Sequence, residues 1–142
     1  MGQQTDVKQS RLTQTGWIVQ GPCRVKGVSL RNSTSAVGRV FLFDTSTAPV
    51  TATYAQSTTT VTVTSTAHGL NTGDWVGIGY VPDGSQRSAT CGQYQITKVD
   101  ANSFTITDPN STTVSSTTTC YYVTGSGQWL YVKGLSAADQ FV

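Results

Sequence analysis

The alternation of apolar and polar positions is clearest in residues 60–107, where it has the period of two that is typical of β-strands. Alternating or apolar runs occur at 60–64, 75–78, 94–99 and 104–107, and turns rich in Gly, Asn and Asp separate them. One set of side chains therefore faces inward, and the stretch predicts a compact β-module. The expected core residues of this module, with Trp75 and Phe104 both inside, are Val61, Val63, Trp75 or Val76, Ile78, Tyr94, Ile96, Phe104 and Ile106.

The turns of this module follow a recognisable spacing. The segments are His68-Gly69-Leu70, Thr72-Gly73-Asp74, Val76 and Ile78, Gly92-x-Tyr94-x-Ile96, and Val99-Asp100-x-Asn102-x-Phe104-Thr105-Ile106. This combination resembles a small β-barrel repeat that recurs in structural proteins of tailed bacteriophages. It is also similar to a module of ubiquitin-activating enzymes, where that module carries no chemistry of its own. The resemblance covers about a third of the chain and implies a virion component. A longer loop at 82–91 departs from the pattern.

The residues on either side of the module also predict strands. A short strand is expected at 16–19, and the alternation of residues 23–31 changes phase at Gly27, which is typical of a β-bulge. Residues 39–44 are apolar on both faces and predict a central strand covered on both sides. Segments 121–123 and 129–132 are strand-like as well. The order of features in residues 16–44 loosely resembles the opening of small β-sandwich proteins of tailed-phage virions.

Thr- and Ser-rich segments at 55–59 and 108–120 flank the module, and they predict two polar linkers. We therefore expect an all-β protein in which a small β-sandwich, jelly-roll or Ig-like, carries an inserted small β-barrel module. In this division residues 1–15 form an N-terminal arm, 16–54 plus 121–142 form the β-sandwich host domain, and 60–107 form the inserted module.

Composition agrees with this class. The chain has 142 residues, which suits one domain or two very small ones, and it contains 25 Thr and 15 Ser but no Glu. No apolar run is long enough to cross a bilayer, and the polar residues after Met1 do not resemble a signal peptide, so we expect folding in a cytoplasm. Cys23, Cys91 and Cys120 show no CxxC spacing, and buried thiols are expected rather than a zinc site. A Cys91–Cys120 bridge formed after release from the cell is left open.

The charge of the chain is unevenly distributed, although its net value is only +2. Six of the nine basic residues precede residue 40, against one acid there, Asp6. This positive region can be a solvated face, or it can contact an acidic protein surface or nucleic acid; the residues are neither dense nor interleaved with aromatics, as nucleic-acid binding requires. The candidate partner-binding residues are Lys8, Arg11, Arg24, Lys26 and Arg31.

A catalytic constellation is not recognisable in the sequence. The single histidine, His68, lies in a turn, where we expect it to bond the backbone, and all seven acids are Asp, several of them beside turn residues. We therefore assign no catalytic, cofactor-binding or metal-binding residues and expect no cofactor. The aromatic residues are either core residues or part of a sugar-binding surface: Trp17, Trp75, Tyr80, Tyr94, Tyr121, Tyr122, Trp129 and Tyr131.

Three functions are compatible with these features. The first is a structural virion protein, namely a capsid decoration or cement protein that binds the head lattice, with a trimer as the favoured assembly. Its partner would be the major capsid protein or a neighbouring virion subunit, without a membrane and without direct nucleic-acid contact; it would be assembled in the host cytoplasm. The second is a tail, neck or fibre component whose projecting module binds host-surface glycans. The third, a small polysaccharide-active enzyme, is disfavoured because no site is recognisable.

Overall fold

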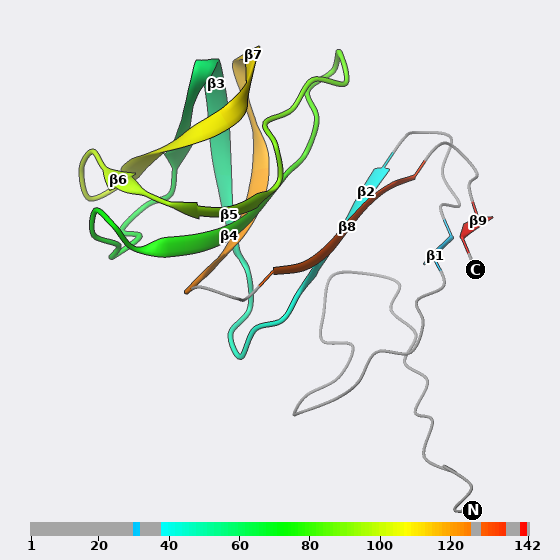
Figure 1. Cartoon of the computed structure of the whole chain (residues 1–142), viewed down its shortest axis with the longest axis horizontal. Helices are drawn as coiled ribbons and strands as arrows, with labels where there is room; N and C mark the ends of the chain where they lie inside the picture. Colours follow the sequence, from blue (N-terminus) through cyan, green and yellow to red (C-terminus); the bar gives the residue numbers. More distant parts are fainter. Residues whose placement is uncertain (1–29, 32–37, 126–128, 136–139, 142) are drawn as a thin grey trace, which may run out of the picture.

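The structure is a computed structural model, and it describes residues 30–31, 38–125, 129–135 and 140–141. Every regular element in these residues is a β-strand (Figure 1), which confirms the all-β prediction. The strands, in chain order, are β1 (Leu30–Arg31), β2 (Gly38–Phe43), β3 (Val50–Thr64), β4 (Trp75–Tyr80), β5 (Gly92–Gln95), β6 (Thr97–Lys98), β7 (Ser103–Thr124), β8 (Trp129–Leu135) and β9 (Gln140–Phe141). The predicted arm, the strand at 16–19 and the bulge at Gly27 lie outside the described residues.

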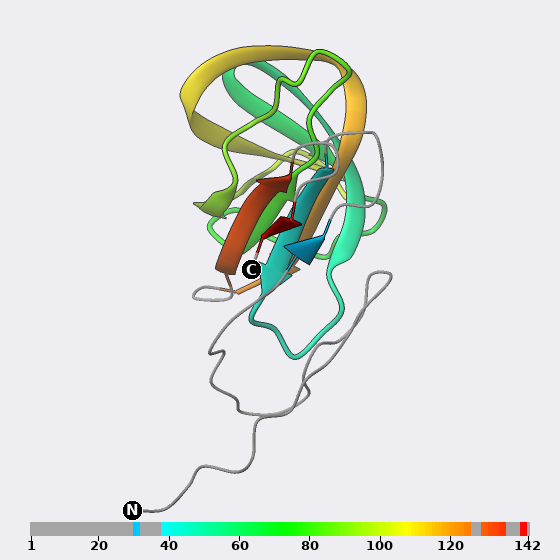
Figure 2. The ribbon, with the colours of Figure 1, turned by 90° about the vertical axis from the view of Figure 1, so that its right-hand side faces the viewer.

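Three antiparallel sheets contain these strands. The largest has the order β3-β7-β4-β5, with β6 also paired to β7, while β1–β9 and β2–β8 are two-stranded. The early part of β7 pairs with β6, as in Thr97 opposite Thr105, and its last residues pair with β4, as in Gly79 opposite Tyr121. Because β4, β5 and β6 follow one another in the chain, they bridge the two halves of β7, and the sheet curls around a core (Figures 1 and 2).

The curl depends on a bend that β3 and β7 share. The two strands pair from Thr64 opposite Ser103 to Val50 opposite Tyr122, and the register shifts twice between these ends. The shifts insert extra residues into β7, and one of the insertions contains Pro109, which cannot donate to a ladder and is tolerated at bulges. Such irregularities allow a strand to pass from one layer of a sandwich or barrel to the other.

The two predicted linkers are wrong, because residues 55–59 lie inside β3 and residues 108–120 lie inside β7. The polarity of these segments has another cause: Thr is polar but also β-branched, so it suits the exposed face of a bent strand. Moreover, β4 pairs with residues 120–124, so one sheet continues across the expected boundary at residue 120. The strands expected to belong to the module and to its host are therefore joined by direct backbone pairing.

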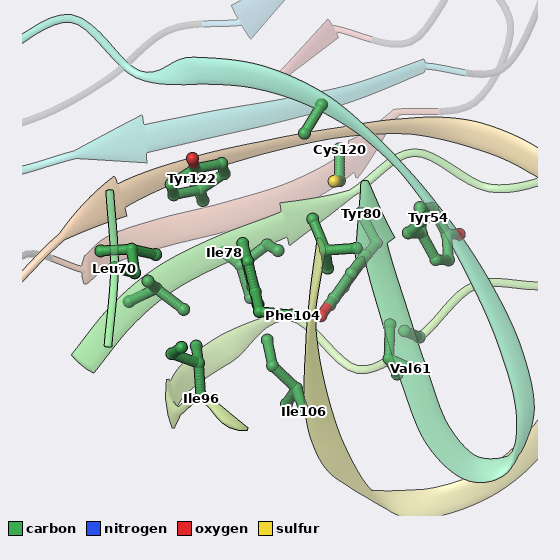
Figure 3. Close-up of a cluster of buried hydrophobic side chains, with 14 of the residues drawn as sticks. Tyr54, Val61, Leu70, Ile78, Tyr80, Ile96, Phe104, Ile106, Cys120 and Tyr122 are labelled. Atoms are coloured by element: carbon green, nitrogen blue, oxygen red, sulfur yellow. The ribbon is translucent and has the colours of Figure 1, made fainter. Parts of the chain in front are cut away.

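The core fills the interior of the curled sheet (Figure 3). The sequence correctly placed seven residues in it, each at most 3% exposed: Val61, Val63, Val76, Ile78, Ile96, Phe104 and Ile106. Tyr94 is half-buried and packs against this cluster. Trp75 was wrongly placed inside, since its side chain is 41% exposed and Val76 takes the inward position. The core also extends beyond 60–107 and includes Tyr54, Cys120 and Tyr122.

The β2–β8 pair lies against the opposite face of the curled sheet. Phe41 of β2 packs on Tyr121 of β7, with ring centroids 6.0 Å apart, and it also covers Gly79 of β4. The prediction that residues 39–44 form a central strand is not confirmed, because β2 pairs with β8 alone among the described strands and residues 39–43 are only half-buried. An apolar run of this length does not distinguish a central strand from a ribbon packed on a sheet.

Candidate interaction surface

Of the five basic residues predicted to bind a partner, the structure describes only one. Arg31 lies in β1, where its backbone is paired with Gln140 of β9. The other four candidate residues lie outside the described residues: Lys8, Arg11, Arg24 and Lys26. Their role in partner binding stays a prediction.

His68 holds two turns together through its ring. Its Nδ1 accepts a hydrogen bond from the Leu70 amide at 3.0 Å, and its Nε2 lies 3.0 Å from the carbonyl oxygen of Asp100. Because a carbonyl only accepts, Nε2 carries the proton and the imidazole is the neutral tautomer. The ring also packs edge-on against Phe104, with centroids 5.3 Å apart. The predicted role of a turn histidine bound to the backbone is confirmed, and both nitrogens are occupied.

The carboxylates at this end of the sheet cap their own turns, as predicted. Asp74 Oδ2 accepts the Asn71 amide at 2.8 Å, and Asp100 Oδ1 accepts the Asn102 amide at 2.7 Å. The bond from Asn102 is the main reason why the pKa of Asp100 lies below its usual value. Asn102 in turn accepts the Ala67 amide at 2.9 Å and so links the turn to the His68 loop. These polar residues stabilise the fold.

The loop between β4 and β5 is anchored to core strands near both ends. The Tyr54 hydroxyl donates to the carbonyl of Val81 at 2.7 Å, close to where the loop begins. Near its end, the Thr90 amide donates to Asp108 Oδ2 at 2.6 Å, and the Tyr94 hydroxyl donates to the Thr90 carbonyl at 2.7 Å. Asp108 is almost completely buried and also accepts the Asn110 amide at 2.8 Å. Hydrogen bonds therefore fix both ends of this loop, which departs from the phage-type pattern.

An internal ion pair orders the tip of this loop. Asp83 Oδ1 accepts the amides of Ser85 and Arg87, both at 2.8 Å, and Oδ2 lies 2.9 Å from the Arg87 guanidinium. The amide of Arg87 is the largest cause that lowers the pKa of Asp83. Gln86 takes a positive φ of 62°, which few non-glycine residues adopt. The residues of the tip, 84–87, are exposed on this ordered frame, and in Figure 1 the loop projects beyond the strands.

Arg39 and Cys91 connect β2 with the base of the same loop. Arg39 Nη1 donates to the Ser88 hydroxyl at 2.9 Å and to the Tyr80 carbonyl at 3.2 Å. Cys91 Sγ accepts the Tyr80 amide at 3.3 Å, and burial raises the pKa of the Cys91 thiol. Cys91 and Cys120 are both free thiols, so the structure does not contain the bridge that was left open. The expectation of a buried thiol is confirmed for Cys120, whereas Cys91 is half-buried and Cys23 lies outside the described residues.

Trp75 is the large aromatic side chain that was wrongly predicted to be buried. It stands at the start of β4 opposite Gln95 of β5, and the Gln95 amide group donates to the Gly73 carbonyl at 3.3 Å. A partly exposed indole beside amide and carbonyl groups offers a flat apolar surface with polar neighbours. The other candidate aromatics of the described sheet are less accessible: Tyr80 and Tyr122 are buried, and Tyr94 and Tyr121 are half-buried. Trp129 and Tyr131 lie in β8, and Trp17 lies outside the described residues.

Within the described ranges, no three His, Cys, Asp or Glu side chains are placed to hold a metal ion. The same part of the chain contains no helix long and apolar enough to cross a membrane. No protein-family model and no curated protein matches the sequence. The arrangement of the described residues offers two features suited to recognition, namely the ordered loop tip at 84–87 and the exposed indole of Trp75.

Proposed function

We propose that this protein is a non-enzymatic structural component of a bacteriophage virion, namely a capsid decoration protein that binds and stabilises the head lattice. The observation that supports the proposal is the role of the residues that match the phage-type repeat. His68, Asp74 and Asn102 hold turns, while Ile96 and Phe104 fill the core. A module whose motif residues serve its own fold contributes shape and rigidity, which a structural protein of a particle requires.

Attachment is assigned to the basic N-terminal residues. Lys8, Arg11, Arg24, Lys26 and Arg31 would face the acidic surface of the major capsid protein or of a neighbouring subunit, in an oligomer for which a trimer is favoured. Exposed charges of this kind contribute only about 0–1 kcal/mol each to folding, but complementary charge steers docking and contributes more when it is desolvated. The curled sheet would then project from the particle.

The copy number of the protein in purified particles tests this proposal. A decoration protein occupies repeated positions of the head lattice and is expected on the order of hundreds of copies, whereas a part built on one closed ring is present in about a dozen or fewer. Quantitative mass spectrometry against the major capsid protein measures the ratio. Absence from purified particles would refute a virion role, and a count of about a dozen or fewer would refute the head assignment.

A second candidate is a tail, neck or fibre component that binds host-surface glycans. The exposure of Trp75 favours it, because sugars stack their apolar faces on indole rings and bond to neighbouring amides such as that of Gln95. Glycan-array binding that is lost in Trp75→Ala but retained in Val50→Ala, a matched exposed apolar position, would support this function. Equal binding by both variants would exclude Trp75 as the site.

A further inference from the structure

One edge of the curled sheet is formed by β3 along its whole length. β3 has 15 residues, occupies the terminal position of the sheet, and pairs only with β7 among the described strands. A terminal strand carries a row of backbone N–H and C=O groups on its free side, and these groups are a template for another strand. Natural proteins usually protect such an edge with charged side chains, prolines or bulges.

Most of these protections are missing from β3. The sequence contains no Lys, Arg, Asp or Glu from residue 45 to residue 73, and β3 itself contains no proline. The irregularities in its pairing lie between Tyr54 and Thr60, so residues 60–64 form a regular strand without a bulge. In this stretch Val61 and Val63 are completely buried, while Thr60, Thr62 and Thr64 are exposed. The unprotected part of the edge is therefore short, regular and uncharged.

We propose that residues 60–64 of β3 pair with the same residues of a second copy, antiparallel and across a two-fold axis. With Thr62 on the axis, Val61 lies opposite Val63 of the partner subunit and Thr60 lies opposite Thr64 of the partner subunit. This register keeps valine on the core side and threonine on the outer side of both copies. The contact is isologous, so it closes as a dimer and does not continue into a filament.

A second copy fits this edge because the edge is complementary to itself. An identical strand reproduces the Thr-Val-Thr-Val-Thr alternation with no change of phase, and it brings no like charges together. The neighbouring segment of β7 supports the same conclusion, since residues 103–107, which pair with residues 60–64, are also without charge. The basic residues lie elsewhere in the sequence, so this contact uses none of the groups assigned to capsid attachment and does not rest on the proposed function.

A charge introduced at Thr62, on the proposed two-fold axis, tests the contact. The oligomeric state of the full-length protein is measured by sedimentation. Thr62→Lys places two ammonium groups opposite each other, whereas Thr107→Lys adds the same charge at an exposed position of β7, away from the free edge. We expect the parent and Thr107→Lys to form dimers, or hexamers in which this two-fold contact joins two of the favoured trimers. Thr62→Lys should weaken the dimer by about a hundredfold or more, because like charges that face each other in an interface cost several kcal/mol. An equimolar mixture of Thr62→Lys and Thr62→Glu should restore it.

A disulfide cross-link between two copies tests the proposed register of the two β3 strands. Thr62→Cys should form a disulfide-linked dimer on mild oxidation, because residues on the axis of an antiparallel pair have neighbouring Cβ atoms. Thr107→Cys and the parent, with its own three cysteines, should show only background cross-linking. A parent that stays monomeric, or Thr62→Lys and Thr107→Lys variants that sediment alike, would overturn the proposal. Association that is lost on deletion of residues 1–29 but not in Thr62→Lys would also overturn it.

Discussion

The ring of Phe41 in β2 lies so close to Gly79 in β4 that a Cβ on Gly79 would stand 2.4 Å from Phe41 Cδ1. Only a residue without a side chain permits this approach, and the contact seats β2 on the outer face of the curled sheet. It connects two segments that the sequence places far apart, since Gly79 belongs to the predicted module and Phe41 to the predicted host. The same face of β4 includes Gly77, which is also buried.

Gly79→Ala should therefore destabilise the protein by about 1–3 kcal/mol, the usual cost of overpacking. Gly92→Ala is the matched control, because a Cβ there meets the Tyr94 ring at 3.4 Å, an ordinary contact. Chemical denaturation of both variants measures the difference. In a Phe41→Ala background the cost of Gly79→Ala should disappear, and a cost that persists would show that the ring is not its cause.

Phe104 and Trp75 should respond very differently to truncation. Phe104 has no exposed surface and touches the rings of His68 and Tyr122, so Phe104→Ala should cost about 3–5 kcal/mol. Trp75 is 41% exposed, and Trp75→Ala should cost about 1 kcal/mol or less. Urea unfolding of the two variants checks the contrast, and equal losses of stability would contradict the burial described above.

Acid should weaken the loop that Asp83 orders. The pKa of Asp83 is lower in the folded protein than its usual value, so its contribution to stability is fully present above the unfolded pKa of about 4 and is lost as the pH falls through the folded pKa. Asp83→Asn should therefore be less stable than the parent at pH 7, and the difference should shrink below about pH 4. Asp44→Asn, in the exposed turn after β2, serves as the control. A difference that does not change with pH would exclude the ion pair as its source.

The two described thiols should be unreactive in the folded protein. Burial raises the pKa of Cys120 to about 12 and also raises the pKa of Cys91, so almost no thiolate exists at neutral pH. In a Cys23→Ser background, a thiol reagent at pH 7.5 should modify Cys120 only as fast as the protein unfolds, and it should modify the half-buried Cys91 more slowly than an unfolded cysteine. Denaturant should restore the full reaction. Fast modification of both thiols in the native Cys23→Ser protein would contradict this prediction.

Removal of the basic arm should separate attachment from folding. A variant that lacks residues 1–14 and carries Gln at positions 24, 26 and 31 should fold but fail to enter particles, because we propose that complementary charge steers the docking. Circular dichroism measures the fold, and the protein composition of purified particles measures incorporation. Lys98→Gln, which removes an exposed positive charge from β6, should be incorporated normally. Normal incorporation of the arm-deleted variant would refute this route of attachment.

Local alternation was sufficient to predict the strand class and most of the core, since residues such as Val61 and Ile106 follow the period of two. It was not sufficient to choose between Trp75 and Val76, because both are apolar and adjacent. The Thr-rich segments were misread as linkers because threonine satisfies both a polar and a β-branched criterion. Contacts such as Thr90 with Asp108 join distant segments of the chain, and no local pattern reveals them.

The length of β7 determines when this protein can fold. This strand of 22 residues is the common partner of β3, β4 and β6, so the sheet cannot close on the ribosome until residues 118–124 have emerged. Residues 60–107 by themselves lack residues 118–124, and their excision would remove β4 and β6, which pair with β7. We therefore expect one cooperative transition that is slow for a chain of this size, because its pairings connect residues far apart in sequence.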